Sequence, residues 1–244
     1  MVPAAAGGID GTWKADLATV QIDSKPDELL LKDGKFSCAT CTPAYTVAAD
    51  GAFHAVTRPY ADSMAVKIVD EHTVTTSAKK GGAAVGENKY SVSPDGKTLT
   101  VDFTDSSVPN ATPVKGSLTE TRSADAPGGA HAISGSWKID KYNNISDEGL
   151  TVTFKLNGDT MHMSTPSGVS YDAKVGGPDV AIKGDTAGTT AAVTKSGDSY
   201  VETDKRDGKV ISVTTMTVGA DSKLHVLNED KRNGSTVKYD ANKA

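Results

Sequence analysis

The sequence predicts an all-β protein made of two tandem antiparallel up-and-down β-barrels. Three observations lead to this fold class. The composition suits short strands, turn signals recur about every 8–12 residues, and one short segment is written twice, as GIDGTWKAD at residues 8–16 and AISGSWKID at residues 132–140. These two segments hold the only tryptophans of the chain, Trp13 and Trp137.

The composition sets the first limits on fold and function. Of the 244 residues, 37% are hydrophobic and 5% aromatic, while Gly, Thr, Val and Ser are abundant, a balance that favours strands and turns. The net charge of −5 argues against a nucleic-acid partner. No apolar run approaches the roughly 20 residues that span a bilayer, so no membrane span is expected. No phosphate loop or dinucleotide fingerprint occurs, and no cofactor is expected.

The duplication extends far beyond the tryptophans. YTVAADGAFHAV from Tyr45 matches YDAKVGGPDVAI from Tyr171, and the segment from Ser77 matches the segment from Thr203, at an offset of 126 residues. We therefore expect one barrel over residues 8–124, a linker over 125–131 and a second barrel over 132–244. Two halves of one larger sheet system remain the alternative.

Strand signals follow the chain in order. Residues 27–34, DELLLKDG, fit either one helical turn or a strand, and their counterpart from residue 147 is clearly a strand, so we expect strands in both. Residues 64–87 contain two further turns. Residues 88–103 predict a hairpin around Pro94-Asp95-Gly96-Lys97, and residues 150–164 predict another around Asn157-Gly158, because apolar and polar residues alternate on both sides of each turn.

The tryptophan motif carries a resemblance. Gly11-Thr12-Trp13 and Gly135-Ser136-Trp137 resemble the Gly-x-Trp opening of the lipocalin and fatty-acid-binding (calycin) group. The layout is also similar to secreted bacterial proteins with a GTWK opening. The resemblance implies that each tryptophan closes one barrel end under a basic residue from the last strand. Arg122 is the expected cover for Trp13, and Lys243 the available substitute over Trp137.

The two cysteines, Cys38 and Cys41, form a C-x-x-C pair without a second pair that could complete a zinc site. A local disulfide in an exported protein is the expected state. A reduced pair, or half of a metal site with a histidine, remains open. The small-residue N-terminus, MVPAAAGGID, resembles the stretch around a signal cleavage site. We therefore expect a mature secreted or periplasmic protein, with an ordinary flexible tail as the alternative.

Candidate chemistry concentrates in one segment, FHAVTRPYADSM at residues 53–64. If the protein is an enzyme, His54, Ser63 and Asp70 are the candidate catalytic residues of a hydrolase of esters or similar bonds, although no motif supports them. Arg58 and Tyr60 are the candidate ligand-binding residues, and no metal site is assigned. The preferred hypothesis is an exported binding protein for a small apolar or amphipathic ligand, since a closed meander leaves a barrel interior for one ligand. A structural envelope protein is a further alternative, and the oligomeric state stays open.

Overall fold

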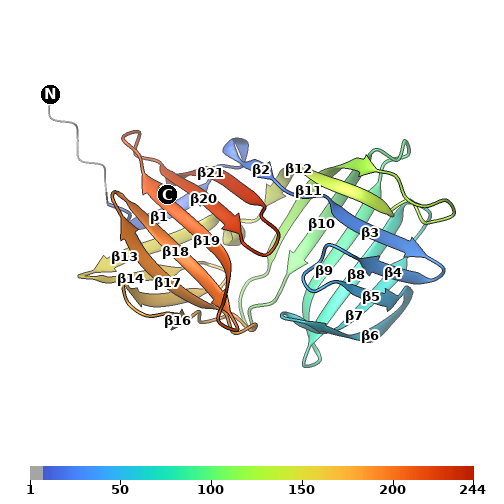
Figure 1. Cartoon of the computed structure of the whole chain (residues 1–244), viewed down its shortest axis with the longest axis horizontal. Helices are drawn as coiled ribbons and strands as arrows, with labels where there is room; N and C mark the ends of the chain where they lie inside the picture. Colours follow the sequence, from blue (N-terminus) through green and yellow to red (C-terminus); the bar gives the residue numbers. More distant parts are fainter. Residues whose placement is uncertain (1–7) are drawn as a thin grey trace. The chain divides into compact units, whose positions relative to one another are not determined.

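The computed structural model describes residues 8–244, so the Ala-rich start of the N-terminus, which underlies the export hypothesis, lies outside the described residues. Strands dominate, and the predicted all-β class with two nearly closed antiparallel barrels is confirmed (Figure 1). None of the helices among the described residues is long and apolar enough to cross a membrane.

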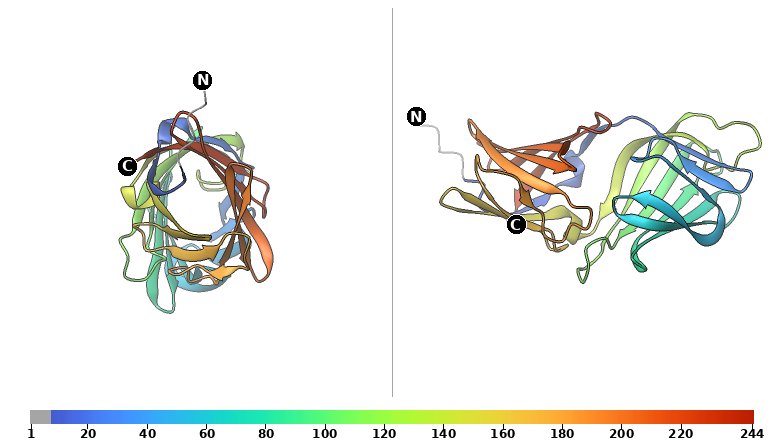
Figure 2. Two further views of the ribbon diagram at one scale, coloured as in Figure 1. Left: turned by 90° about the vertical axis from the view of Figure 1, so that its left-hand side faces the viewer. Right: turned by 60° about the horizontal axis from the view of Figure 1, so that its bottom comes forward.

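The chain divides into two compact units. Unit 2 comprises Ser24–Ser107 and Pro113–Ile145, and unit 1 comprises the described residues up to Asp23, Val108–Thr112 and Ser146–Ala244. Each unit holds one sheet that curves round on itself, as the views in Figure 2 show.

Unit 2 is a ten-stranded sheet in the order β5-β4-β3-β12-β11-β10-β9-β8-β7-β6, with every neighbouring pair antiparallel. The two ends of this order, β5 and β6, follow one another in the chain. The strands are β3 (Asp27–Lys32), β4 (Lys35–Cys38), β5 (Tyr45–Ala48), β6 (Asp50–Arg58), β7 (Ala61–Ile68), β8 (Thr73–Lys80), β9 (Ala83–Val92), β10 (Thr98–Asp105), β11 (Val114–Ala124) and β12 (Gly135–Ile145).

Unit 1 has the order β15-β14-β13-β1-β21-β20-β19-β18-β17-β16, and β2 pairs with β21 outside this path. An isolated bridge between Ser170 and Lys183 connects the two ends of the order. The elements are β1 (Gly11–Ala15), η1 (Leu17–Thr19), β2 (Gln21–Asp23), α1 (Asp147–Leu150), β13 (Thr151–Asn157), β14 (Thr160–Ser164), β15 (Ser170–Lys174), β16 (Val180–Ala181), β17 (Thr190–Ser196), β18 (Ser199–Arg206), β19 (Lys209–Val218), β20 (Leu224–Asp230) and β21 (Thr236–Lys243).

The first strand of each sequence repeat closes the barrel of the other repeat, an arrangement called the strand exchange below. β1 lies between β13 and β21, and β12 lies between β3 and β11. The compact units therefore differ from the continuous segments 8–124 and 132–244 that the sequence predicts. Unit 2 is nearly continuous in the sequence and ends with its tryptophan strand. Unit 1 combines chain segments that precede and follow unit 2 in the sequence with the short segment Val108–Thr112.

Most of the local predictions agree with the structure. β3 is a strand, but its counterpart from residue 147 begins with the helical turn α1 (Asp147–Leu150) and becomes a strand only at β13, so the strand prediction is wrong for residues 147–150. Hairpins form at both predicted turns. Gly96 and Gly158 have φ values of 72° and 64°, a left-handed conformation that glycine adopts without the steric cost that a side chain brings. Alternation places one face of each strand inside, which gives each unit its own apolar core.

Each tryptophan lies buried at one end of its barrel. The indole N–H of Trp137 donates to the carbonyl of Ile133 at 2.8 Å, and that of Trp13 donates to the carbonyl of Ile9 at 2.8 Å. Both indoles and both isoleucines are at most 2% exposed. The polar edge of each ring is thus satisfied while its apolar body fills the core.

The cation that covers each ring differs from the predicted pairing. The Arg122 guanidinium lies 4.0 Å from the centre of the Trp137 ring, and the Lys243 ammonium lies 5.4 Å from that of Trp13. Arg122 therefore covers Trp137, and the expectation that it covers Trp13 is wrong. The cause is the strand exchange, because β11 pairs Arg122 with Trp137 and β21 pairs Lys243 with Trp13.

Arg122 also ties the end of unit 2 together. Its three guanidinium nitrogens donate to the carbonyls of Gly96, Ser134 and Ala132 at 2.5, 2.6 and 2.7 Å. Gly135 makes this approach possible, since a Cβ there would collide with the Arg122 guanidinium and with the Ala124 carbonyl, and its φ of 131° also disfavours a side chain.

The strand exchange predicts which fragment folds alone. Residues 24–145 contain all ten strands of the unit 2 sheet and should give a cooperatively unfolding β-protein with a buried Trp137. Residues 8–124, the sequence repeat, lack β12 and leave β3 and β11 as open edges, so they should not give a cooperative transition. Far-UV circular dichroism and tryptophan emission during thermal unfolding compare the two fragments. Cooperative folding of 8–124 together with an unfolded 24–145 would contradict the exchange.

Arg122 should contribute more to the stability of the protein than Lys243. Arg122→Ala should lower the free energy of unfolding by about 2–4 kcal/mol, because a stacked cation and several charge-assisted hydrogen bonds are lost. Lys243→Ala, which removes only a distant ring contact, should cost under about 1 kcal/mol. Denaturant unfolding measures both, with exposed Lys97→Ala as the control. A larger loss for Lys243→Ala than for Arg122→Ala would reverse this assignment.

Candidate ligand-binding site

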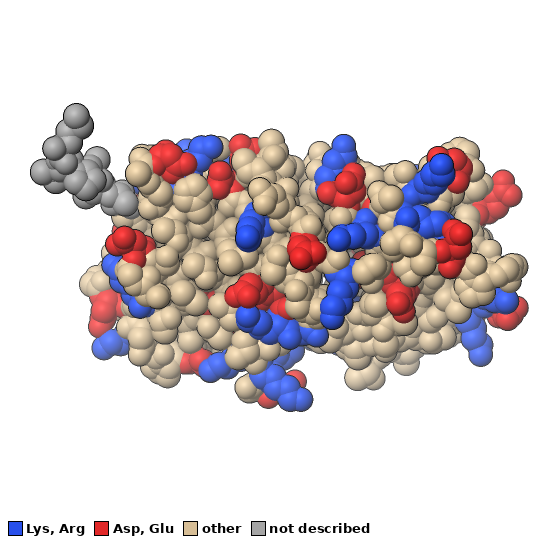
Figure 3. Space-filling model, turned by 45° about the horizontal axis from the view of Figure 1, so that its top comes forward, with Lys and Arg blue, Asp and Glu red and all other residues tan. Residues whose placement is uncertain are grey.

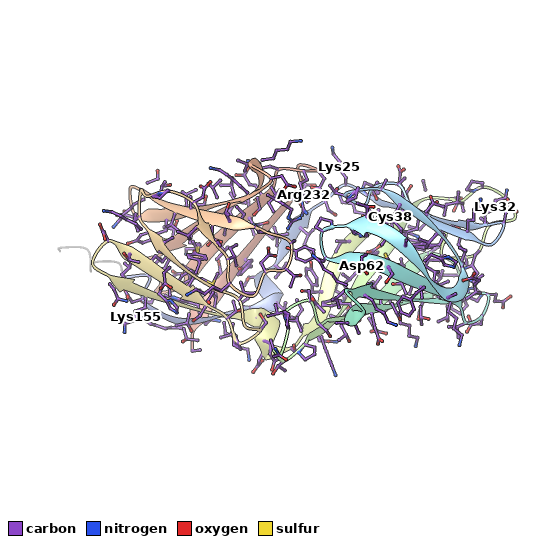
Figure 4. The ribbon with its side chains drawn as sticks, turned by 90° about the horizontal axis from the view of Figure 1, so that it is seen from below. Lys25, Lys32, Cys38, Asp62, Lys155 and Arg232 are labelled. Carbon is purple, nitrogen blue, oxygen red and sulfur yellow. A yellow bond between two sulfur atoms is a disulfide. The ribbon has the colours of Figure 1, made fainter. Side chains whose placement is uncertain are left out.

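The three candidate catalytic residues do not form a triad. His54 pairs with Met64 across β6 and β7, whereas Ser63 pairs with Ala55, so the side chains of His54 and Ser63 leave opposite faces of the sheet. The His54 Nε2 contacts Asp50 at 2.8 Å, and the Ser63 hydroxyl donates to Asp62, labelled in Figure 4, at 3.2 Å. The Asp70 carboxylate accepts from the backbone N–H of His72 in the β7–β8 turn.

The two candidate ligand-binding residues lie where β6 turns into β7. The Arg58 guanidinium lies 4.5 Å from the centre of the Tyr45 ring, and its Nη1 is buried without a hydrogen-bond partner among the described residues. Tyr60, in the turn itself, is 38% exposed. The Lys80 ammonium donates to the Pro59 carbonyl at 2.6 Å, which joins this turn to the β8–β9 turn. These turns lie at the end of unit 2 opposite to Trp137, called the far end below.

The predicted Cys38–Cys41 disulfide is present and pins the β4–β5 loop, also at the far end. Cys38, labelled in Figure 4, is buried in the core of unit 2. Between the two cysteines, the Thr40 hydroxyl accepts from the Glu28 backbone N–H at 3.0 Å and lies 3.4 Å from an Asp27 oxygen. The disulfide therefore holds a loop whose side chains reach the start of β3.

An acidic side chain that the sequence reasoning missed lies inside unit 2. Glu120 on β11 pairs with Leu99 on β10, which is fully buried, so both side chains point into the barrel. Glu120 is 5% exposed, and its Oε2 has no hydrogen-bond partner among the described residues. A buried polar atom without a partner is costly and is the kind of exception that needs an explanation.

The surroundings of Glu120 are acidic and aromatic. Burial, and then the charge of Asp27, raise the pKa of Glu120 from its ordinary 4.5 to about 8. Burial likewise raises the pKa of Asp27, against the hydrogen bond from Thr40. Burial raises the pKa values of Tyr90 and Tyr142, and the charge of Glu120 adds to both shifts. The interior of unit 2 thus presents two carboxyl groups beside a set of tyrosines.

The signal for this site was in the sequence. In SLTETR, alternation places Leu118, Glu120 and Arg122 on one face of a strand, and Leu118 and Arg122 both have inward roles. Once the inward face of the strand is known, the sequence therefore predicts that the Glu120 carboxyl group lies inside the barrel. Residue type alone favours His54 and Ser63, but it does not indicate which face of the sheet each side chain occupies.

Unit 1 also holds acids on its inner face, in a different place. Glu202 and Asp204 on β18 pair with the buried Val193 and Ala191 on β17. The Tyr171 hydroxyl donates to Glu202 at 2.6 Å, and the Ser212 hydroxyl donates to Asp204 at 2.8 Å. Burial is the main cause that raises the pKa of both carboxyl groups. Each of these carboxyl groups has a protein donor, whereas Glu120 has none among the described residues, although the Asp204 Oδ1 is also buried without a partner there.

A pocket of about 600 Å³ lies on the outer face of unit 1, between the η1–β2 segment and strands β19–β21. His225 is its main titratable group, with its ring nitrogens 2.7 Å from Asp240 and 3.2 Å from Asp221. The hydrogen bond to Asp240 raises the pKa of His225. These groups therefore pair with one another. On the face in Figure 3, acidic and basic side chains are interspersed.

No group of three or more His, Cys, Asp or Glu side chains among residues 8–244 is arranged to hold a metal ion. The fold and the buried acids define the class of protein: a chain of two nearly closed antiparallel barrels with ionisable groups on their inner faces. Comparison of the chain with protein-family models, with curated proteins and with solved structures gave no match.

The raised pKa of Glu120 predicts a pH-dependent stability. Between about pH 4.5 and pH 8 the folded protein holds a proton on Glu120 that the unfolded chain has released, so stability falls as pH rises through this window. Glu120→Gln removes that proton linkage. Relative to the wild type, the free energy of unfolding of the variant should therefore rise by up to about 1.4 kcal/mol per pH unit across the window.

Denaturant unfolding of both proteins at several pH values, followed by Trp137 emission in a Trp13→Phe background, measures this difference. Comparison at each pH cancels the contribution of Glu202 and Asp204, which both proteins share. A constant difference between the two proteins across the window would show that Glu120 titrates normally.

Proposed function

We propose that the chain is an exported, lipocalin-like small-molecule-binding protein, and that an amphipathic ligand binds inside unit 2. The observation that carries this proposal is the Glu120 oxygen, buried yet without a hydrogen-bond partner among the described residues. A ligand with a hydrogen-bond donor would satisfy that oxygen, and its apolar part would pack on the valines and leucines of the surrounding inner face.

The architecture supports this proposal. Barrels of lipocalin type close one end and hold one small ligand inside. In unit 2 the Ile133–Trp137 layer under Arg122 fills one end. Arg58, Tyr60 and the disulfide loop lie at the far end, which is the proposed route of entry. The lipocalin-like assignment rests on the Gly-x-Trp motif and the cation over each ring.

The disulfide supports export, since such bonds persist in oxidising compartments and are rare in the cytosol. A hydrolase built on His54, Ser63 and Asp70 receives no support, because His54 and Ser63 leave opposite faces of the sheet. A purely structural role predicts a barrel that binds nothing, and the binding experiment separates it from the proposal.

Binding inside unit 2 is testable with the fluorescent amphiphile N-phenyl-1-naphthylamine and the full-length protein. The wild type should give a saturable rise in fluorescence. Leu118→Trp, which fills the inner face beside Glu120, should remove it, because the probe and the new side chain need the same space. Leu227→Trp, in the outer pocket of unit 1, is the matched control and should leave the signal unchanged.

Thermal unfolding of both variants checks that they remain folded, since overpacking commonly costs about 1–3 kcal/mol. Native mass spectrometry of the freshly purified protein adds a search for a carried-over ligand. Failure of the wild type to bind the probe, with no carried-over ligand, would favour the structural alternative. Loss of signal only in Leu227→Trp would move the site to the outer face of unit 1.

A further inference from the structure

The electrostatic environment of Glu120 indicates more than a generic ligand. Desolvation and the charge of Asp27 are the causes that raise its pKa, and no cation acts in the opposite direction. The described residues also form no ion pair with Glu120 within 4 Å. The interior of unit 2 thus holds two neighbouring acids without a counter-charge at Glu120.

A buried carboxylate is stable only when it is paired and hydrogen-bonded, and otherwise it keeps its proton. The missing partner is therefore a group that both donates hydrogen bonds and carries positive charge. An ammonium group meets both conditions. Tyrosine rings beside it would add favourable cation–π contacts, and their hydroxyl oxygens would accept further hydrogen bonds.

We propose that unit 2 selects ligands with a protonated amine, and that the ammonium group binds the free Glu120 oxygen with Asp27 as the second acid. This inference rests on the proposed function and narrows its ligand class. The amine is the polar end of the amphipathic molecule, and its apolar end packs on the inner face around Leu99 and Val101.

The groups that act on Glu120 or face its neighbours are few. Asp27 contributes negative charge at Glu120, and Tyr90 and Tyr142 each interact with the charge of Glu120. Tyr45 interacts with Tyr90, and Arg58 stacks on Tyr45. The one cation of this set, Arg58, acts on the hydroxyl of Tyr45 and is absent from the causes that shift Glu120.

Proton balance gives the proposal a distinctive signature. Below about pH 8, Glu120 in the free protein is a neutral acid, so an alkylammonium ion that pairs with its carboxylate displaces one proton to solvent. The affinity should rise by about tenfold per pH unit up to this pH and then level off while the amine stays protonated. A neutral ligand releases no proton and should show a flat profile.

The experiment compares three probes of equal chain length with the full-length protein: octylammonium, octanol and octanoate. Isothermal titration calorimetry in two buffers of different ionisation enthalpy measures affinity and the number of protons released. Octylammonium should bind most tightly, with proton release below pH 8, and octanol more weakly with none. Octanoate should bind most weakly, because its buried carboxylate would have no counter-charge beside the two acids.

Glu120→Gln tests the residue itself, since the amide keeps the shape and removes the charge. Octylammonium should bind about tenfold or more weakly to it and release no proton, whereas octanol should bind as to the wild type. Glu202→Gln, which alters a buried acid of unit 1, is the matched control and should leave octylammonium binding unchanged.

The outcomes separate the two proposals. Octanol or octanoate binding as tightly as octylammonium, or octylammonium binding unaffected by Glu120→Gln, would overturn the amine selectivity and leave the binding function standing. Failure of the wild type to bind any of the three probes or N-phenyl-1-naphthylamine would overturn both. Retained octanol binding by Glu120→Gln shows that the variant is folded and keeps its loss of octylammonium binding interpretable.

Discussion

The insertion of a tryptophan strand between the first and last strands of a barrel is the contact on which both units depend. β12 connects β3 with β11 in unit 2, and β1 connects β13 with β21 in unit 1. Without these strands each barrel would have two long edges whose backbone donors and acceptors lack partners. Three contacting groups fix the position of each tryptophan strand along its neighbours. They are the indole, the carbonyl four residues before it and the cation above the ring.

The closed end has a direct electrostatic consequence inside unit 2. Ile133 and Trp137 fill that end with apolar atoms, and Phe36 and Leu99 extend the apolar region along the inner face. A carboxyl group that alternation places next to this region cannot be hydrated as it would be in water, so its charged form is disfavoured. The same side chains that stabilise the barrel thus give Glu120 its raised pKa.

Local sequence signals predicted the strands, hairpins and disulfide because each depends on residues a few positions apart. Gly96 and Gly158 mark their turns, and alternation marks the faces.

The strand exchange could not be predicted from such local signals. Trp13 and Trp137 sit in nearly identical segments, so the motif alone does not indicate which barrel each strand closes. That ambiguity is why Arg122 was paired with the wrong tryptophan. Glu120 is not identified by reactive residue type, because its distinctive property is a charge on the inward face of a strand.

The two barrels have kept their closed ends and have diverged inside. Leu99 pairs with Glu120 in unit 2, and Leu224, at the matching place in unit 1, pairs with Ala241. The position of the free carboxyl in unit 2 is therefore occupied in unit 1 by a buried methyl group. Unit 1 carries its acids on β18 instead, where Tyr171 and Ser212 already donate to them. A change on the inner face leaves the pairing of the strands intact, so a duplicated barrel can alter the chemistry of its interior while the tryptophan layer preserves the fold. Asp204 also has one oxygen without a partner, but Glu120 is the internal acid to which no described residue donates a hydrogen bond, and ligand selectivity is therefore assigned to unit 2.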